Sequence, residues 1–328
     1  MKKFVFMASL LFASYSAIGQ GFYGDINVGY GLGYPGRIHN DGTGLGTSVQ
    51  GTIDRDGVSG VVTQMKNSDK SINGGVGQGL NLQITPGYMF NDHIGVELGI
   101  NYYLGSRVTV QEVNYDLHAH VSIAGMSDEL DVEDYVDVLA TSKSQQMRLI
   151  PSLVLSTGAS KNISGYAKFG LVLPVFGSST VSMDRTDKTV VNSGFDFVNG
   201  KITYDEIAET KTSQEQVING SFTVGFKGAM GINFKVAEKI SVFAEVFATN
   251  LQIDRKKAEL TKFEIGGVDQ LPNMTTYQKE ITYVNELSNT SNSAEMNPDF
   301  NPGSAREALK MGTNFNQLGL AVGVKFNF

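Results

Sequence analysis

Apolar and polar residues alternate in a regular way at several places along the chain. The first such segment runs from Phe22 to Leu32, where every second side chain is apolar or glycine and most of the intervening residues are polar or small. Because successive side chains of a strand point to opposite faces, this alternation predicts a strand with one apolar face. Its length of about eleven residues matches a tilted strand that crosses a bilayer.

Seven further segments repeat the alternation, and the one at 240–247 is the least regular. There Phe243 and Phe247 fall on the side that is otherwise polar. The segments other than the first cover residues 80–90, 94–104, 146–156, 163–173, 221–234, 240–247 and 317–328.

The spacing of these segments distinguishes a barrel from a soluble sandwich, whose strands would also alternate. Short connections at 91–93, 156–162 and 235–239 alternate with long ones. A meander whose two sets of turns face opposite sides of a membrane has this order of connections, and repeated long loops are unusual in a compact soluble domain. The long connections cover residues 33–78, 105–145, 176–220 and 252–315.

The sequence therefore predicts an all-β fold, an eight-stranded antiparallel up-and-down transmembrane β-barrel with long extracellular loops. An even number of strands leaves both ends of the chain on one side of the membrane. Two polar segments inside the loops, 189–204 and 257–265, also alternate. They leave open that the barrel strands continue beyond the membrane as hairpins.

The N-terminal residues have the features of an export signal. Lys2 and Lys3 precede an apolar stretch that is too short for a permanent membrane helix. The small residues Ala17 and Gly19 fit the −3 and −1 pockets of a signal peptidase. We predict a signal peptide at 1–19 with cleavage before Gln20, followed by a single barrel domain at 20–328; an uncleaved anchor is the alternative.

Composition and charge exclude several classes of protein. The chain has no cysteine, which rules out a lipoprotein anchor, disulfides and thiolate metal sites. After the signal, no apolar run reaches 18 residues. Removing Lys2 and Lys3 from the 26 basic residues leaves 24 against 33 acidic residues, a net charge of −9. Nucleic acid is disfavoured as a partner, because a binder needs clustered basic residues.

Two segments carry a family resemblance. The strand-turn-strand run from Gly87 to Glu97 (GYMFNDHIGVE) and the closing run from Gly319 to the terminal Phe328 resemble small outer-membrane β-barrel proteins, the OmpA-, OmpX- and OmpW-like family of Gram-negative bacteria. Gln20 directly after the cleavage site is similar to the Bacteroidetes-type members. The resemblance implies a place in the cell outer membrane, contact with its lipid, and recognition of the C-terminal strand by the barrel-assembly machinery. It implies a fold and a location far more strongly than an activity.

The interior of an eight-stranded barrel is just wide enough for side chains to fill it. Three pairs are expected among the inward-facing charges: Asp25 with Lys325, Glu245 with Lys227, and Glu97 with Arg148, the last at different depths. Either these charges neutralise each other and fill the lumen, because an isolated buried ion is costly, or one pair gates a narrow pore. The predicted inward-facing charges are Asp25, Glu97, Arg148, Lys168, Lys227, Glu245 and Lys325.

Three other motifs carry residue types that can bind a metal ion. His118 and His120 would point to one side of a strand, but no third ligand is evident. The acidic run from Asp128 to Asp137 has oxygen ligands for Ca²⁺ or Mg²⁺, yet it lacks the spacing and central glycine of an EF-hand. The run from Asp54 to Gly57 is a weaker case. Solvated loops are the alternative in each case, and we predict no metal site.

Catalysis is also not expected. A hydrolase at the barrel rim would need Ser, His and a carboxylate to converge, and no histidine falls inside a predicted barrel strand. The chain has neither a nucleophile elbow nor a phosphate-binding glycine loop. We predict no catalytic or cofactor-binding residue, no cofactor and no enzyme.

The function expected from these features is that of a non-catalytic integral outer-membrane protein. Its long surface loops, more than half of the mature chain, would mediate interaction with a surface or envelope protein partner or support envelope integrity. The alternative is a narrow passive, porin-like channel for ions or small solutes. A structural part of a larger envelope complex is a third possibility. The sequence names no solute, ligand or partner.

Overall fold

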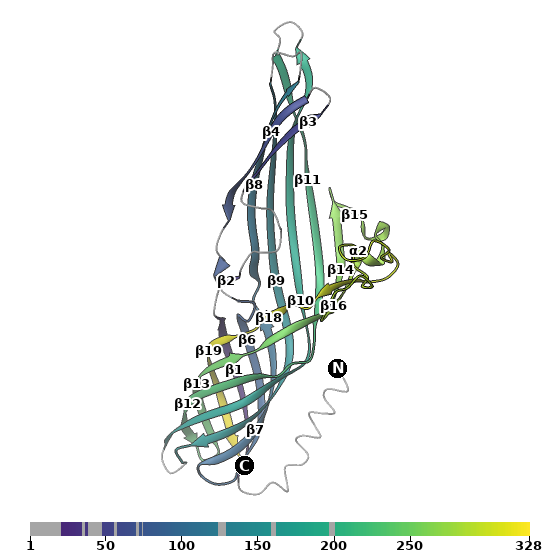
Figure 1. Ribbon diagram of the computed structural model, residues 1–328. Helices are drawn as coiled ribbons and strands as arrows, with labels where there is room; N and C mark the ends of the chain where they lie inside the picture. Colours follow the sequence, from purple (N-terminus) through teal and green to yellow (C-terminus); the bar gives the residue numbers. More distant parts are fainter. Residues whose placement is uncertain are drawn as a thin grey trace.

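The computed structural model describes residues 21–34, 37–38, 48–55, 58–69, 72–73, 75–123, 129–158, 162–196 and 201–328 (Figure 1). Within these ranges, the side chains of 37–74, 115–134 and 189–208 are not described. The predicted signal peptide at 1–19 lies outside the described residues. In the described part of the chain, no helix is long and apolar enough to cross a membrane.

Eight strands close into a ring through antiparallel pairing of each with its neighbours in chain order. Pairing of the last strand with the first, Asp25 opposite Lys325, closes the ring. The predicted eight-stranded antiparallel up-and-down barrel is confirmed. Its strands are β1 (Phe22–Gly33), β6 (Gly79–Met89), β7 (Ile94–Gly105), β9 (Glu129–Ser156), β10 (Ile163–Asp196), β12 (Gly225–Ala237), β13 (Ile240–Asn250) and β19 (Gln317–Asn327).

The predicted alternation separates the two faces of the barrel wall. Apolar side chains such as Ile26, Phe169 and Leu320 are 57%, 62% and 66% exposed on the outer face, while the inward-facing Asp25 and Arg148 are 2% and 1% exposed. An apolar outer surface around a polar interior is the construction of a membrane-spanning barrel.

The irregular alternation of the segment 240–247 is explained by packing inside the barrel. Phe243 and Phe247 of β13 point inward and are buried, 4% and 3% exposed. The ring of Phe247 packs against Ala229 and Ala321 and lies where a side chain at Gly319 would stand. Aromatic residues on the polar face therefore fill the lumen, and small residues on the neighbouring strands make room for them.

The connections predicted as long loops are largely strands. β9 and β10 run on beyond the barrel wall and change partners there: Gln145 pairs with β7, Ser142 with β8, and Ser178 with β11. A tall sheet results, with the order β3–β4–β8–β9–β10–β11–β14 (Figure 1). Its further strands are β3 (Ser48–Arg55), β4 (Val58–Asp69), β8 (Val108–Ile123), β11 (Lys201–Gly220) and β14 (Gln252–Ile265).

Residues 189–196, 201–204 and 257–265, for which the sequence leaves hairpin extensions open, belong to this sheet. Strand β10 reaches Asp196, β11 begins at Lys201, and β14 covers 257–265. The same end of the barrel carries a short separate pairing of β2 (Arg37–Ile38) with β5 (Ile72–Asn73).

Residues 266–312 form a compact excursion beside the tall sheet (Figure 1). Strand β16 pairs with β14, and β17 pairs parallel to β16. The Asn292 side-chain amide donates to the carbonyls of Asn301, Ser304 and Ala305 at 2.9–3.2 Å. Ile281 packs on Ile218 and Ala258 of the sheet. The elements from this excursion to β19 are β15 (Val268–Asp269), η2 (Leu271–Asn273), α2 (Thr276–Lys279), β16 (Glu280–Val284), β17 (Arg306–Leu309) and β18 (Gly312–Asn314).

Candidate functional site

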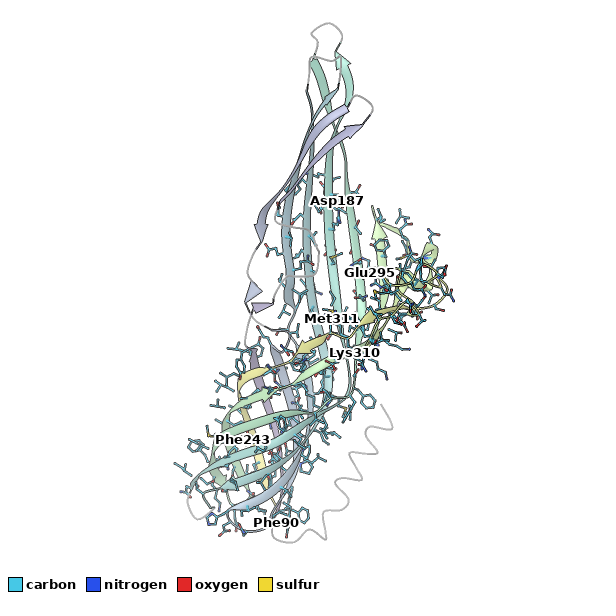
Figure 2. All side chains as sticks on the ribbon, in the orientation of Figure 1. Phe90, Asp187, Phe243, Glu295, Lys310 and Met311 are labelled. Carbon is cyan, nitrogen blue, oxygen red and sulfur yellow. The ribbon has the colours of Figure 1, made fainter. Side chains whose placement is uncertain are left out.

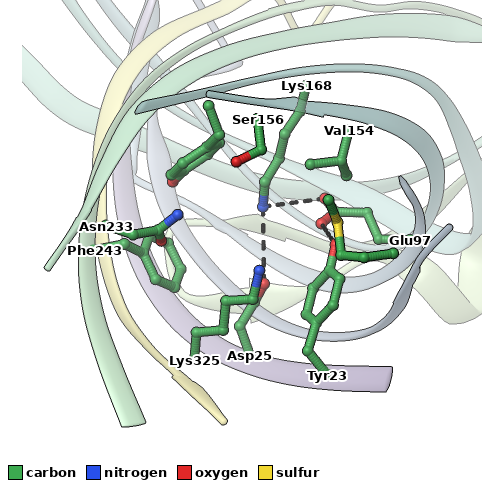
Figure 3. A pocket seen from close by; sticks show the side chains of 11 residues that line it. Tyr23, Asp25, Glu97, Val154, Ser156, Lys168, Asn233, Phe243 and Lys325 are labelled. Atoms are coloured by element: carbon green, nitrogen blue, oxygen red, sulfur yellow. Dashed lines mark hydrogen bonds and ion pairs between the residues drawn. The ribbon is translucent and has the colours of Figure 1, made fainter. Parts of the chain in front are cut away.

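The turn end of the lumen, where the short connections lie, holds a cluster of buried charges around Lys168. Its ammonium nitrogen lies 3.1 Å from Glu97 Oε1, 3.7 Å from Glu245 Oε2 and 3.8 Å from Asp25 Oδ2. Figure 3 shows the lysine side chain reaching across the lumen toward Asp25 and Glu97. These carboxylates come from β1, β7 and β13, so one ammonium group links three strands of the wall to β10.

Tyrosine hydroxyls complete the coordination of two carboxylates. Tyr23 donates to Glu97 Oε2 at 2.9 Å, and Tyr166 donates to Glu245 Oε2 at 3.0 Å. Both tyrosines are buried. Hydrogen bonds of this kind are needed in the interior because a buried carboxylate oxygen without a partner is costly.

The charges of this part of the lumen balance. Lys168, Lys227 and Lys325 face the carboxylates of Asp25, Glu97 and Glu245. Lys227 lies 3.8 Å from Glu245 Oε1 and donates to Gln83 Oε1 at 3.3 Å. The Lys325 ammonium lies 3.6 Å from the centre of the Tyr23 ring, a cation–π contact. We call these six residues the luminal charge cluster.

The three expected ion pairs have different outcomes. The pair of Lys227 with Glu245 is confirmed. Asp25 and Lys325 are cross-strand neighbours, as expected, but the carboxylate pairs with Lys168 while the Lys325 ammonium lies over Tyr23.

The pair of Glu97 with Arg148 is wrong, because the strand register separates the two side chains in depth. Glu97 lies opposite Ser152, whereas Arg148 lies opposite Asn101. Neither the central position of Lys168 nor the hydrogen bonds that Tyr23 and Tyr166 donate to the carboxylates were predicted from the sequence. Tyr23 and Tyr166 were visible as aromatic residues on the inward face of their segments, which was the available signal.

Arg148 lies above this cluster, toward the hairpin end, and is 1% exposed. Its guanidinium lies over the Tyr103 ring, 4.2 Å from the ring centre, and its Nε donates to Gln146 Oε1 at 2.9 Å. Its Nη2 has no hydrogen-bond partner among the described residues. Arg148 is therefore a buried cation held by an aromatic ring and a neutral amide.

An apolar cluster closes the lumen at the hairpin end. The segment from Gly75 to Gln78 covers it: Tyr103 Oη lies 2.7 Å from the Val76 carbonyl and 3.0 Å from the Gln78 carbonyl, and Gln317 Nε2 donates to the Gly77 carbonyl. Side chains thus fill the lumen at both levels. The cluster consists of Tyr103, Ile150, Val172, Leu251, Ile253 and Phe315, with Val76 packed against it.

The cavity lined by the luminal charge cluster is small. It measures about 30 Å³ and is lined by Tyr23, Asp25, Glu97 and Lys168, among others (Figure 3). A volume of this size has room for little more than one water molecule. At this level of the lumen, the described side chains leave too little space in the cavity for a solute.

A second and much larger cavity, of about 1150 Å³, lies at the base of the tall sheet. Strands β9, β10 and β11 form its floor, β8 contributes Gln111 at one flank, and β14 contributes Arg255 at the other. Met311, beside β18, lines it at the junction with the barrel (Figure 2). We call this cavity the hairpin groove.

The candidate metal ligands lie mostly outside the described side chains. This holds for His118, His120, the acidic run as far as Asp134, and Asp54–Gly57. The absence of a metal site at these positions stays a prediction. His93 lies at a short turn, with Nδ1 3.1 Å from the Ser156 carbonyl oxygen.

Comparison with known proteins gives a distant structural likeness. No protein family and no curated protein matches the sequence. Among solved structures, the chain is similar to the outer membrane protein OprG from Pseudomonas aeruginosa, at 12% sequence identity and a TM-score of 0.31, over 94% of this chain and 96% of that one. The closed ring of strand pairings, rather than this likeness, defines the fold.

Proposed function

We propose that this protein is a non-catalytic integral outer-membrane β-barrel protein that recognises a partner through the tall sheet and the excursion at 266–312. The observation that carries the proposal is the contrast between a lumen filled at two levels and a large ordered structure built on one end of the barrel. Rigid scaffolds commonly place recognition in the segments that project from them.

The outward apolar side chains support the membrane placement. Short turns at one end and long hairpins at the other match periplasmic and exterior ends of an outer-membrane barrel. The apolar outer face of the barrel would contact outer-membrane lipid, and β19 with the terminal Phe328 would be the strand that the assembly machinery recognises. The tall sheet would then stand outside the cell.

Filling of the lumen supports recognition over passive transport. A solute that passed through the barrel would have to displace the Lys168 contacts and then the apolar cluster around Tyr103. Breaking buried ion pairs is strongly unfavourable. The alternative function, a narrow porin-like channel, requires the luminal charge cluster to open.

Ion conductance of the mature chain tests this choice. The protein is refolded in detergent, its folding is checked by a heat-dependent gel shift, and it is inserted into planar bilayers. We expect no conductance steps from the wild type. Steady, salt-dependent steps that rise further in Lys227→Ala would instead favour the gated channel and overturn the proposal.

Site-directed photo-cross-linking in intact cells tests the recognition role itself. A cross-linking residue replaces the exposed Glu295 of the excursion, which Figure 2 shows beside the tall sheet. The control replaces Met230, a 69% exposed side chain on the apolar outer face of β12. We expect a protein adduct of defined mass at Glu295 and none at Met230. Equal labelling at the two positions, or none from any exposed site of the excursion, would contradict recognition.

A further inference from the structure

The hairpin groove has a charge composition unlike that of the whole chain. The sequence has 33 acidic against 26 basic residues. Among the described residues that line the groove, Arg255, Lys256 and Lys257 are basic and none is acidic. In so acidic a chain, a cavity with three cations and no carboxylate is locally positive and attracts anions.

Unused hydrogen-bond donors lie on both flanks of the groove. Arg255 Nε on β14 and Gln111 Nε2 on β8 are buried atoms without a hydrogen-bond partner. Buried donors are normally paired, since an unpaired one loses its contact with water and gains nothing in return. Both atoms are donors, so the missing partner is an acceptor.

A third unpaired donor lies behind the floor of the groove. Gln146 lines the groove and accepts a hydrogen bond from Nε of the buried Arg148, whose Nη2 has no partner. This guanidinium has no ion pair with any described carboxylate and adds positive charge beneath the groove. The electrostatic preference for an anion therefore comes from the barrel as well as from β14.

The groove also has an apolar side. Phe176 and Phe222 are 75% and 73% exposed, and Met311 is 52% exposed, and all three line it. Large exposed apolar residues that border polar ones indicate a binding surface. The complement to such a lining is a molecule with an acidic group and an apolar body.

The position of the groove indicates the side from which an occupant enters. Its lining continues along the tall sheet to Met183 and Gln214, which pair with each other beyond the barrel wall. The groove therefore extends away from the outer apolar face of the barrel. With the tall sheet outside the membrane, as proposed above, a dissolved molecule reaches the groove without leaving the water.

We propose that the hairpin groove binds a free amphiphilic carboxylate, with the carboxylate at Arg255 and the apolar body against Phe222 and Met311, which lie beside Arg255. Arginine forms paired, charge-assisted hydrogen bonds with a carboxylate. The inference rests on the recognition role proposed above, since it names a ligand class for the same surface. Its test uses purified protein, so its failure differs from failure of the conductance or cross-linking experiments.

Calorimetric titration with octanoate, octanol and acetate tests the proposal. The wild-type protein is held in nanodiscs of zwitterionic lipid. We expect octanoate to bind at least tenfold more tightly than octanol, which lacks the charge, and than acetate, which lacks the chain. Equal affinity for octanoate and octanol, or no binding of octanoate, would overturn the proposal.

Two variants locate the binding. Arg255→Met should weaken octanoate binding about tenfold or more, because it removes a charge-assisted contact. Lys262→Met on the same strand should leave it unchanged, since Lys262 pairs with Glu264 at 3.0 Å and does not line the groove. Unchanged binding in a folded Arg255→Met protein refutes the site. If octanoate no longer binds when the protein is held in nanodiscs of phosphatidylglycerol, this anionic lipid competes for the groove. A lipid head group would then be the occupant, which contradicts the proposal of a free ligand.

Discussion

Charge is arranged differently in the barrel lumen and in the hairpin groove. In the luminal charge cluster, three lysines face three carboxylates, and Lys168 alone lies within 4 Å of all three acids. In the groove, three consecutive cations from Arg255 to Lys257 line the cavity without a described carboxylate. The two regions belong to one chain and are separated by the apolar cluster around Tyr103.

The difference follows from the access of water. Charges in the lumen are almost completely buried, so each needs an opposite charge and hydrogen bonds to offset its lost hydration. Lys256 and Lys257 in the groove are exposed, so they keep their hydration and persist without a counter-charge. The lumen therefore uses charge to hold strands together, whereas the groove leaves charge available to a ligand.

The largest expected effect comes from removing Lys168. Lys168→Met retains much of the side-chain length but leaves Asp25, Glu97 and Glu245 without their shared cation. We expect a loss of about 3–5 kcal/mol in the free energy of unfolding, the usual cost of breaking a buried ion pair on one side. Urea unfolding of the refolded barrel in lipid vesicles, followed by the heat-dependent gel shift, measures it.

Lys262→Met is the matched control for this prediction. Lys262 also pairs with a glutamate, but its side chain is 45% exposed, and exposed pairs contribute about 0–1 kcal/mol. Similar losses in the two variants would show that burial does not distinguish the lumen. The comparison between the two regions would then lose its physical basis.

A smaller effect is expected from filling the space around Phe247. A Cβ at Gly319 would lie 2.5 Å from Phe247 Cζ and would also contact the Tyr30 carbonyl, whereas a Cβ at Gly228 would meet nothing within 4 Å. We expect Gly319→Ala to cost about 1–3 kcal/mol through overpacking. Gly228→Ala should change stability by about 0.5 kcal/mol at most.

The same unfolding assay compares the two glycine variants. If the two variants are equally stable, the lumen has free space around Phe247 and is packed less tightly than its side chains indicate. That result would also weaken the argument from filling against a channel.

The barrel could be predicted from the sequence because each of its strands buries one face. The alternation that places Asp25 inward and Ile26 outward can be followed from one residue to the next in the sequence, and the long strands make the period of two clear. The hub formed by Lys168 could not be predicted in this way. It depends on strand register and on which of three lysines reaches across the lumen, and neither follows from periodicity.

The projecting part was harder for two physical reasons. The excursion at 266–312 is held largely by side-chain-to-backbone hydrogen bonds, such as those of Asn292, which leave no periodic signal. The hairpin groove arises where the sheet brings Gln111 of β8 and Arg255 of β14 to one cavity. These residues are far apart in the sequence, and no local motif connects them.

The smallest expected effect is on the groove side of the comparison. Arg255→Met should change the free energy of unfolding by about 0.5 kcal/mol at most in the absence of ligand, since the Arg255 guanidinium has no described carboxylate partner to leave behind. Octanoate should raise the urea midpoint of the wild type, because a ligand that binds only the folded state stabilises it, and it should raise that of Arg255→Met much less. A ligand-free loss as large as that of Lys168→Met would mean that Arg255 is a structural cation like those of the lumen. In that case the positive charge of the groove would stabilise the fold and would not serve ligand binding.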